Sequence, residues 1–214
     1  MKKESYIFET PFFIIRSIFL FSFCTLSFNA ESFELNKNIK DSYSHIISLE
    51  FQKARQILEV ERVSNPDNGL IYLKDNYIDF LTLIIGEDFD YFDEHLDIKK
   101  KRLELLKKCE IGSPYYLYCQ AEIHLQWAFA RIKFQDYFNS AYEIQRAYYL
   151  LRKNNELFPD FYLNKKSLGL LYCIFGSIPE NYQWIVQLSG VRADINAGLS
   201  ELNSFLEICK KDQE

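Results

Sequence analysis

The sequence predicts an all-α fold, built as an antiparallel array of helical hairpins. From Leu35 onward, apolar residues recur at the three- and four-residue spacing of helix faces, with almost none of the alternation typical of strands. Prolines and glycines interrupt this pattern, and the short connections favour antiparallel neighbours. One central segment is apolar on two faces, so it needs a covering layer on each side.

The first two predicted helices, 36–62 and 66–85, depend on apolar stripes. In the first, Phe51, Ala54 and Leu58 fall at i, i+3 and i+7. The stripe of the second consists of Tyr77, Phe80, Leu81, Ile84 and Ile85. Pro66 is expected in the first turn of the second helix. A break near 41–48 within the first segment stays an open alternative.

The next two predicted helices are 88–110 and 114–133. Carboxylates gathered at 87–94 suit a helix N-terminus, and they lack the glycine and distal glutamate of a calcium loop. Ser113 and Pro114 provide a cap and a first-turn proline. The two apolar stripes of 114–133 and its C-terminal flank are Leu117, Ala121, Leu125, Ala128 and Ile132, and Ile123, Trp127, Ala130 and Phe134. This segment is therefore predicted to be an inner helix.

Four more helices complete the prediction, at 136–154, 160–175, 179–188 and 192–210. Pro159 and Pro179 are expected in first turns, and Gly176 is expected to end its helix in a left-handed conformation. The last segment carries an apolar stripe, formed by Ile195, Leu199, Leu202, Leu206 and Cys209.

The N-terminal segment 1–30 is predicted to be a secretory signal peptide. Lys2, Lys3 and Arg16 supply positive charge, and an uncharged apolar run follows up to the small residue Ala30. Residues 31–214 then form the helical domain. The alternative is an uncleaved signal anchor, which would associate with a membrane through residues 12–30.

Composition excludes some classes of protein. The chain has 214 residues, of which 48% are hydrophobic, so it can bury a real core. Its net charge of −5 argues against a nucleic-acid partner. Outside segment 1–30 the cysteines are Cys109, Cys119, Cys173 and Cys209. Buried free thiols are favoured, although a Cys109–Cys119 disulfide across the turn at 111–114 stays open.

A repeat pattern occurs twice. Phe51-x-x-Ala54 is followed by Leu58 and Pro66, and Phe138-x-x-Ala141 repeats the first part. This layout, with a small residue where two helices approach closely, is that of the second helix of a tetratricopeptide repeat. The Trp-Leu-Gly-Tyr part of the consensus is absent.

Longer motifs carry a resemblance to a family. The run 49–58, the motifs Asn65-Pro-Asp-Asn68 and Asn76-Tyr-Ile-Asp-Phe80, and the segment 169–184 look like those of exported bacterial tetratricopeptide-repeat-like proteins. The resemblance covers most of residues 40–206. It implies a TPR-like α-solenoid of the periplasm or cell envelope of a Gram-negative bacterium, of undefined function, and it suggests that this chain is a shortened member.

No catalytic, cofactor or metal site is predicted. His45, His95 and His124 are isolated, and none belongs to a metal-binding motif. The sequence also lacks a glycine-rich phosphate loop and a nucleophile elbow.

The excess of tyrosine is the remaining feature. Tyr115, Tyr116, Tyr142 and Tyr149 are candidates for a groove that binds a protein or peptide partner, although plain helix packing also explains them. The leading function is therefore a non-enzymatic scaffold or adaptor of the cell envelope. The alternative is a small-molecule-binding or enzymatic helical domain with a tyrosine-lined pocket.

Overall fold

A computed structural model describes residues 32–177, 180, 183–191 and 194–211. The chain divides into two compact units, Met1–Ala30 and Glu31–Glu214, and every described residue belongs to the second unit. The predicted signal peptide lies outside the described residues. Within the described ranges, no helix is long and apolar enough to cross a bilayer.

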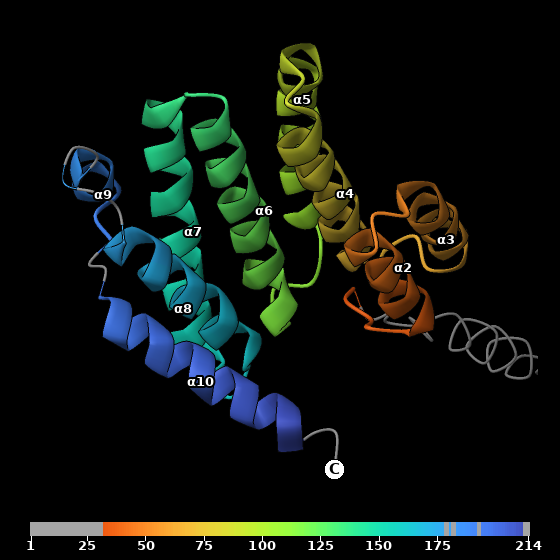
Figure 1. The fold of residues 1–214 in the computed structure, drawn as a ribbon. Coiled ribbons are helices and arrows are strands. Elements are labelled where there is room, and N and C mark those ends of the chain that lie inside the picture. Colours follow the sequence, from red (N-terminus) through yellow and green to blue (C-terminus); the bar gives the residue numbers. More distant parts are fainter. Residues whose placement is uncertain (1–31, 178–179, 181–182, 192–193, 212–214) are drawn as a thin grey trace, which may run out of the picture. The chain divides into compact units, whose positions relative to one another are not determined.

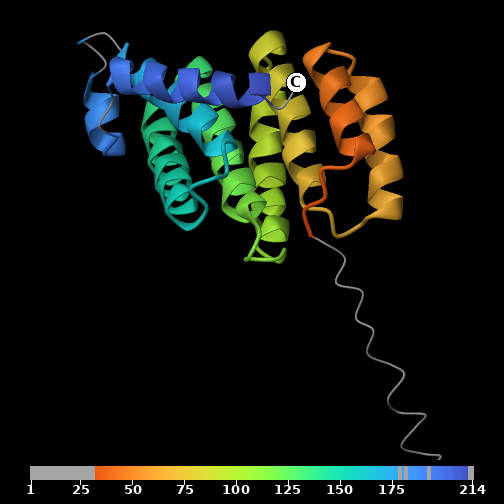
Figure 2. The ribbon, with the colours of Figure 1, turned by 90° about the horizontal axis from the view of Figure 1, so that it is seen from below.

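The described part of the chain is helical and has no strand, which confirms the predicted all-α class (Figure 1). The helices are α2 (Lys37–Ile47), α3 (Phe51–Ser64), α4 (Leu70–Gly86), α5 (Phe89–Leu106), α6 (Pro114–Lys133), α7 (Tyr137–Leu157), α8 (Leu163–Gly176), α9 (Gln183–Ser189) and α10 (Ile195–Lys211). The views in Figures 1 and 2 both show α6 and α7 side by side, as expected for a hairpin with a short connection.

The first predicted helix, 36–62, is wrong as a single element, because residues 48–50 separate α2 from α3. Leu49 is left-handed with φ of 61°, which costs a non-glycine residue about 1 kcal/mol. The backbone N–H of Glu50 donates to the carbonyl oxygen of His45 at 2.9 Å and closes the turn. The break contains no glycine or proline, the residue types from which helix ends are usually predicted.

The prolines have two different roles. Pro114 is in the first turn of α6 as predicted, and the Ser113 hydroxyl accepts a hydrogen bond from the backbone N–H two residues later at 3.3 Å. Pro66 and Pro159 precede α4 and α8 instead, so their predicted first-turn positions are wrong. They end the preceding helices, because proline cannot continue a helix. Pro179 lies outside the described residues.

Glycines allow α8 and α10 to pack closely. The left-handed conformation predicted for Gly176 is wrong, since among the described glycines only Gly190, after α9, has a positive φ, of 69°. A Cβ atom at Gly176 would lie 2.6 Å from Cγ1 of Ile195. A Cβ atom at Gly169 would lie 2.9 Å from the carbonyl oxygen of Gly198. The missing side chains therefore let the two helix backbones come into contact.

Helix α6 has the inner position that its two apolar stripes predict. Every residue from 118 to 128 is buried, so the helix is covered around its whole circumference. Ile123 and Trp127 belong to a large apolar cluster with α2–α5, while Leu125 and Ala128 belong to a second cluster with α7 and α8. Helix α6 thus joins two cores.

The asparagines of the motif at 65–68 surround a buried carboxylate. Glu61 accepts hydrogen bonds from the side-chain amides of Asn36 at 2.7 Å, Asn38 at 3.0 Å, Asn65 at 3.1 Å and Asn68 at 2.8 Å. Burial alone would raise the pKa of Glu61, but these hydrogen bonds outweigh it and the pKa is lowered. Since all four groups donate, this cluster holds the N-terminal helices together and does not suit a cation.

Asn76, from the second quoted motif, plays a similar role between α4 and α6. Its amide nitrogen donates to Gln126 Oε1 at 2.6 Å, and its oxygen accepts from Trp127 Nε1 at 3.1 Å. Both quoted motifs therefore contribute buried polar contacts between elements.

Candidate functional site

A pocket of about 420 Å³ lies among α2, α4, α6, α8 and the C-terminal half of α10. We call it the tyrosine pocket, because its lining includes Tyr43, Tyr77, Tyr115, Tyr118 and Tyr162. The ionisable residues of its lining other than tyrosine are Lys40, Lys74 and Lys166, and no carboxylate lines it. Its volume falls in the range of small-ligand pockets.

Helical spacing explains how distant residues meet here. On α4, Leu70, Lys74 and Tyr77 fall at i, i+4 and i+7, so they share one face. On α2, Ile39 and Tyr43 are four residues apart in the same way. The two faces meet in a T-shaped ring contact between Tyr43 and Tyr77, with centroids 5.7 Å apart.

Lys74 is a buried cation in the wall of the tyrosine pocket. Only 9% of its surface is exposed. Its Nζ lies over the ring of Tyr43, 4.0 Å from the centroid, and 5.5 Å from the centroid of Tyr77. Among the described residues it has no hydrogen-bond acceptor and no ion-pair partner. Burial lowers the pKa of Lys74 to about 8.

The nearby carboxylate of Glu122 forms its hydrogen bonds and its ion pair with groups other than Lys74. It accepts hydrogen bonds from Tyr77 Oη at 2.6 Å, from Ser167 Oγ, and from Lys166 Nζ at 3.3 Å. Burial opposes its ionisation, but the charge of Lys166 and these hydrogen bonds outweigh burial, so the pKa of Glu122 is lowered. Glu122 therefore balances Lys166 and leaves Lys74 uncompensated.

Two phenols of the pocket, those of Tyr115 and Tyr118, stay neutral. Burial raises the pKa of Tyr115 to about 12, and it raises the pKa of Tyr118 further. The Tyr118 hydroxyl accepts a hydrogen bond from Lys166 Nζ at 2.9 Å, and it also interacts with the Ser167 side chain. Tyr162 stacks on Phe205 of α10, with centroids 5.9 Å apart. The pocket combines ring surfaces with hydrogen-bond donors and positive charge.

The four tyrosines predicted for a groove do not share one depression. Tyr115 lines the tyrosine pocket, whereas Tyr142 and Tyr149 line two other depressions. Tyr116 is partly buried against the large apolar cluster. That these residues contact a partner stays a prediction.

Sequence reasoning missed Tyr43, Tyr77 and Lys74 as site residues. The sequence pattern places Tyr77 in an apolar stripe, and Tyr43 lies in the segment 41–48, where the first predicted helix has an alternative break. The available indication was Lys74 itself, a charge between Leu70 and Tyr77 on an otherwise apolar face. Such a lysine is a candidate for a buried, functional position.

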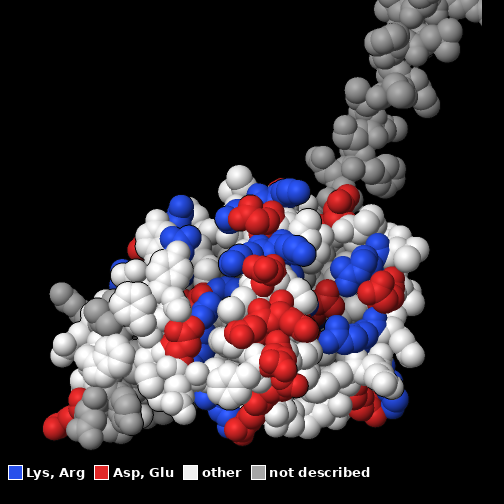
Figure 3. Space-filling view, turned by 90° about the horizontal axis from the view of Figure 1, so that it is seen from above, with Lys and Arg blue, Asp and Glu red and all other residues white. Residues whose placement is uncertain are grey.

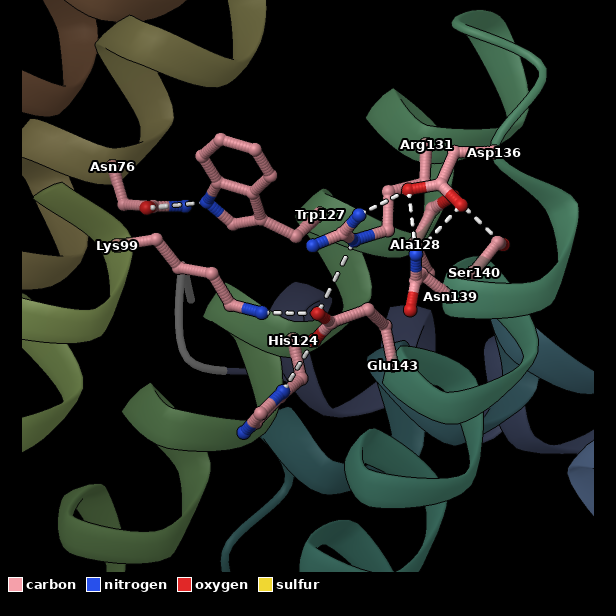
Figure 4. A network of polar contacts seen from close by, with 10 residues as sticks. All are labelled: Asn76, Lys99, His124, Trp127, Ala128, Arg131, Asp136, Asn139, Ser140 and Glu143. Carbon is pink, nitrogen blue, oxygen red and sulfur yellow. Dashed lines mark hydrogen bonds and ion pairs between the residues drawn. The ribbon is translucent and has the colours of Figure 1, made fainter. Parts of the chain in front are cut away.

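A second depression, of about 390 Å³, lies over α5, α6 and α7. Figure 4 shows the carboxylate of Glu143 between Lys99 and His124, with Arg131 beside it. Glu143 accepts from Lys99 Nζ, from His124 Nδ1 at 2.6 Å and from Arg131 Nε at 3.3 Å. Arg131 also pairs with Asp136. We call these five residues the Glu143 network.

The charges of the Glu143 network compensate one another. Burial opposes ionisation of Glu143, but His124 and Lys99 outweigh it and lower its pKa to about 2. Burial lowers the pKa of His124 and keeps its ring neutral. A closed set of ion pairs such as this joins helices and leaves no uncompensated charge for a ligand.

The described residues also bear on a metal site, on a disulfide and on the surface charge. They contain no group of three or more metal-ligating side chains. The four cysteines from Cys109 onward are free thiols, so the open disulfide alternative is not realised. On the face shown in Figure 3, acidic and basic side chains are interspersed.

Comparisons with protein-family models, with curated proteins and with solved structures find no match to this chain. The resemblance to exported tetratricopeptide-repeat-like proteins therefore stays a prediction.

Proposed function

We propose that this protein is a non-enzymatic, TPR-like binding module of the bacterial cell envelope, which captures a protein or peptide partner at the tyrosine pocket. The observation that carries the proposal is the pocket itself, a depression lined by rings and lysines from helices far apart in sequence. Tyrosine provides large contact area at low conformational cost, and for this reason it is common at binding surfaces.

The order of the lining helices supports a binding face. Helices α2, α4, α6 and α8 contribute residues to the pocket, and α3, α5 and α7 contribute none. In an array of hairpins, the first helix of each pair faces one side and the second helix faces the other. In a TPR-like array, the same alternation places the first helix of each pair on the face that binds a partner.

A small-molecule-binding domain is the second candidate. Lys74 and Lys166 converge on one semi-enclosed cavity, a feature more typical of a ligand pocket than of an open groove with scattered charges.

A peptide selection tests partner capture. The full chain is used to select binders from a phage-displayed peptide library. A Ser44→Trp variant places a bulky ring at an exposed position of the pocket lining, and Ser64→Trp is the matched control at an exposed site on α3, outside that lining. Selected peptides should bind the Ser44→Trp variant at least about tenfold more weakly and the control normally. No enrichment, or equal binding to all three proteins, contradicts the proposal.

Fractionation of cells tests the envelope location. A chain that begins at Glu31 and is recovered in the soluble envelope fraction supports export with cleavage. Recovery of the intact chain in the cytoplasmic fraction contradicts it, and an intact chain in the membrane fraction indicates the signal anchor.

A further inference from the structure

We propose that the tyrosine pocket recognises the carboxylate of an apolar ligand, with Lys74 as the residue that pairs with it. The inference adds a ligand class to the proposed binding site, so it depends on that site but not on the ligand being a protein. Three observations carry it: the isolation of Lys74, the charge of the pocket lining, and the chemistry of its walls.

Lys74 differs from the other buried cations of this protein. Lys99 and Arg102 are buried to a similar extent, with 6% and 8% of their surfaces exposed. Lys99 pairs with Glu143, and Arg102 lies 2.5 Å from Asp79. Lys74 has no such partner among the described residues. A buried charge without a counter-ion is costly, and an anionic ligand would supply the missing partner.

The charges around Lys74 favour a ligand with one negative charge. Lys166 is balanced by Glu122, and Lys40 is exposed at the pocket rim. One buried ammonium group, that of Lys74, therefore remains without a counter-ion. A carboxylate matches this single charge, whereas a phosphate usually needs several cationic or backbone donors.

The walls favour an apolar body. Besides the rings of Tyr43, Tyr77 and Tyr162, the lining includes leucines from α4 and α8 and the ring of Phe205. An aromatic ring of the ligand that packs against these tyrosine rings would be stabilised by more than the burial of its apolar area alone. Such a carboxylate has two sources: a free organic acid, or the C-terminal residue of the proposed partner.

Calorimetry with matched probes tests the inference on the full chain. The probes are 2-naphthoate and its neutral counterpart 2-naphthalenemethanol. The wild type should bind the acid at least about tenfold more tightly than the alcohol. Lys74→Met, which keeps the length of the side chain, should lose this preference, and Lys40→Met at the exposed rim should keep it.

The wild-type comparison alone can overturn the inference, even if Lys74→Met does not fold. Equal affinity for acid and alcohol, or no binding of either probe, contradicts it. A folded Lys74→Met protein that keeps the full preference also contradicts it.

A comparison of two peptides distinguishes a free organic acid from the C-terminal residue of a partner as the source of the carboxylate. Acetyl-Ala-Ala-Phe is compared as free acid and as amide. Preference for the free-acid peptide, together with binding of naphthoate, identifies the terminus of a partner chain. Binding of naphthoate with no binding of either tripeptide, and no peptide from the selection, supports the inference while partner capture fails. Selected peptides that bind without any carboxylate preference leave partner capture intact and contradict the inference.

Discussion

At the residue scale, Lys74 is a buried charge whose desolvation the fold does not offset. Replacing it with methionine removes the uncompensated charge and keeps most of the packing, at the loss of a cation–π contact worth about 0.5–1 kcal/mol. We expect Lys74→Met to raise the free energy of unfolding by about 1 kcal/mol at pH 7, measured by urea denaturation. Lys99→Met is the control, and it should lower stability because it breaks a buried ion pair. A loss of stability in Lys74→Met would show that Lys74 supports the fold.

The same residue predicts a pH dependence. The pKa of Lys74 is about 8 in the folded chain, below the ordinary value of 10.5. Between these pH values the unfolded chain holds more protons, so rising pH favours the folded state and the cost of the buried charge disappears. The stability advantage of Lys74→Met over the wild type should therefore shrink as the pH rises from 7 to 10. A constant advantage would contradict the assigned cause.

The ionisation of Glu143 predicts how the stability of the fold changes in acid. Its folded pKa of about 2 lies below the ordinary 4.5, so its contribution to stability is complete above pH 4.5 and is lost as the pH falls toward 2. Glu143→Gln leaves Lys99 and Arg131 without this counter-ion, and we expect a loss of about 3–5 kcal/mol at pH 7. The exposed Glu104→Gln should change stability by less than about 0.5 kcal/mol. A small loss for Glu143→Gln at pH 7, or a loss that persists undiminished at pH 2, would contradict this assignment.

At the element scale, most of the described helices follow from apolar periodicity. The spacing of apolar residues within a helix indicates which of its faces is buried, and no information from other helices is needed. The break at Leu49 does not follow, since this residue is left-handed without being a glycine, and only the folded turn reveals it. The tyrosine pocket was beyond local reasoning for a similar reason. Tyr43, Lys74 and Tyr118 lie on different helices, and only the tertiary arrangement brings them together.

Two glycines provide a matched test of helix packing. A Cβ atom at Gly198 would lie 2.8 Å from the backbone nitrogen of Cys173, an atom that cannot move aside easily. We expect Gly198→Ala to cost about 1–3 kcal/mol and to increase hydrogen exchange across α10. At Gly86 no atom lies within 4 Å of the added Cβ, so Gly86→Ala should be neutral or slightly stabilising. Normal exchange protection of α10 in Gly198→Ala would contradict the close contact with α8.

At the scale of the whole helical unit, α6 connects the two apolar clusters. Because it is buried around its circumference, neither cluster can open fully without exposing it. By contrast, Gly198 is the one buried residue among those described in α10. Helix α10 should therefore separate from the rest at lower free energy than α6.

The labelling rates of two cysteine thiols measure this difference between α6 and α10. Cys119 on α6 is fully buried, and burial raises its pKa, whereas Cys209 on α10 is half-buried. We expect iodoacetamide to label Cys209 readily in native buffer and Cys119 at least about 4,000-fold more slowly, since labelling of Cys119 requires global unfolding, which costs about 5 kcal/mol or more. Mass spectrometry of the digested full chain identifies each labelled thiol. The opening free energy of Cys119 should equal the free energy of unfolding from circular dichroism. Equal labelling rates, or a peptide that links Cys109 to Cys119, would show that α6 is not the closed centre of the fold.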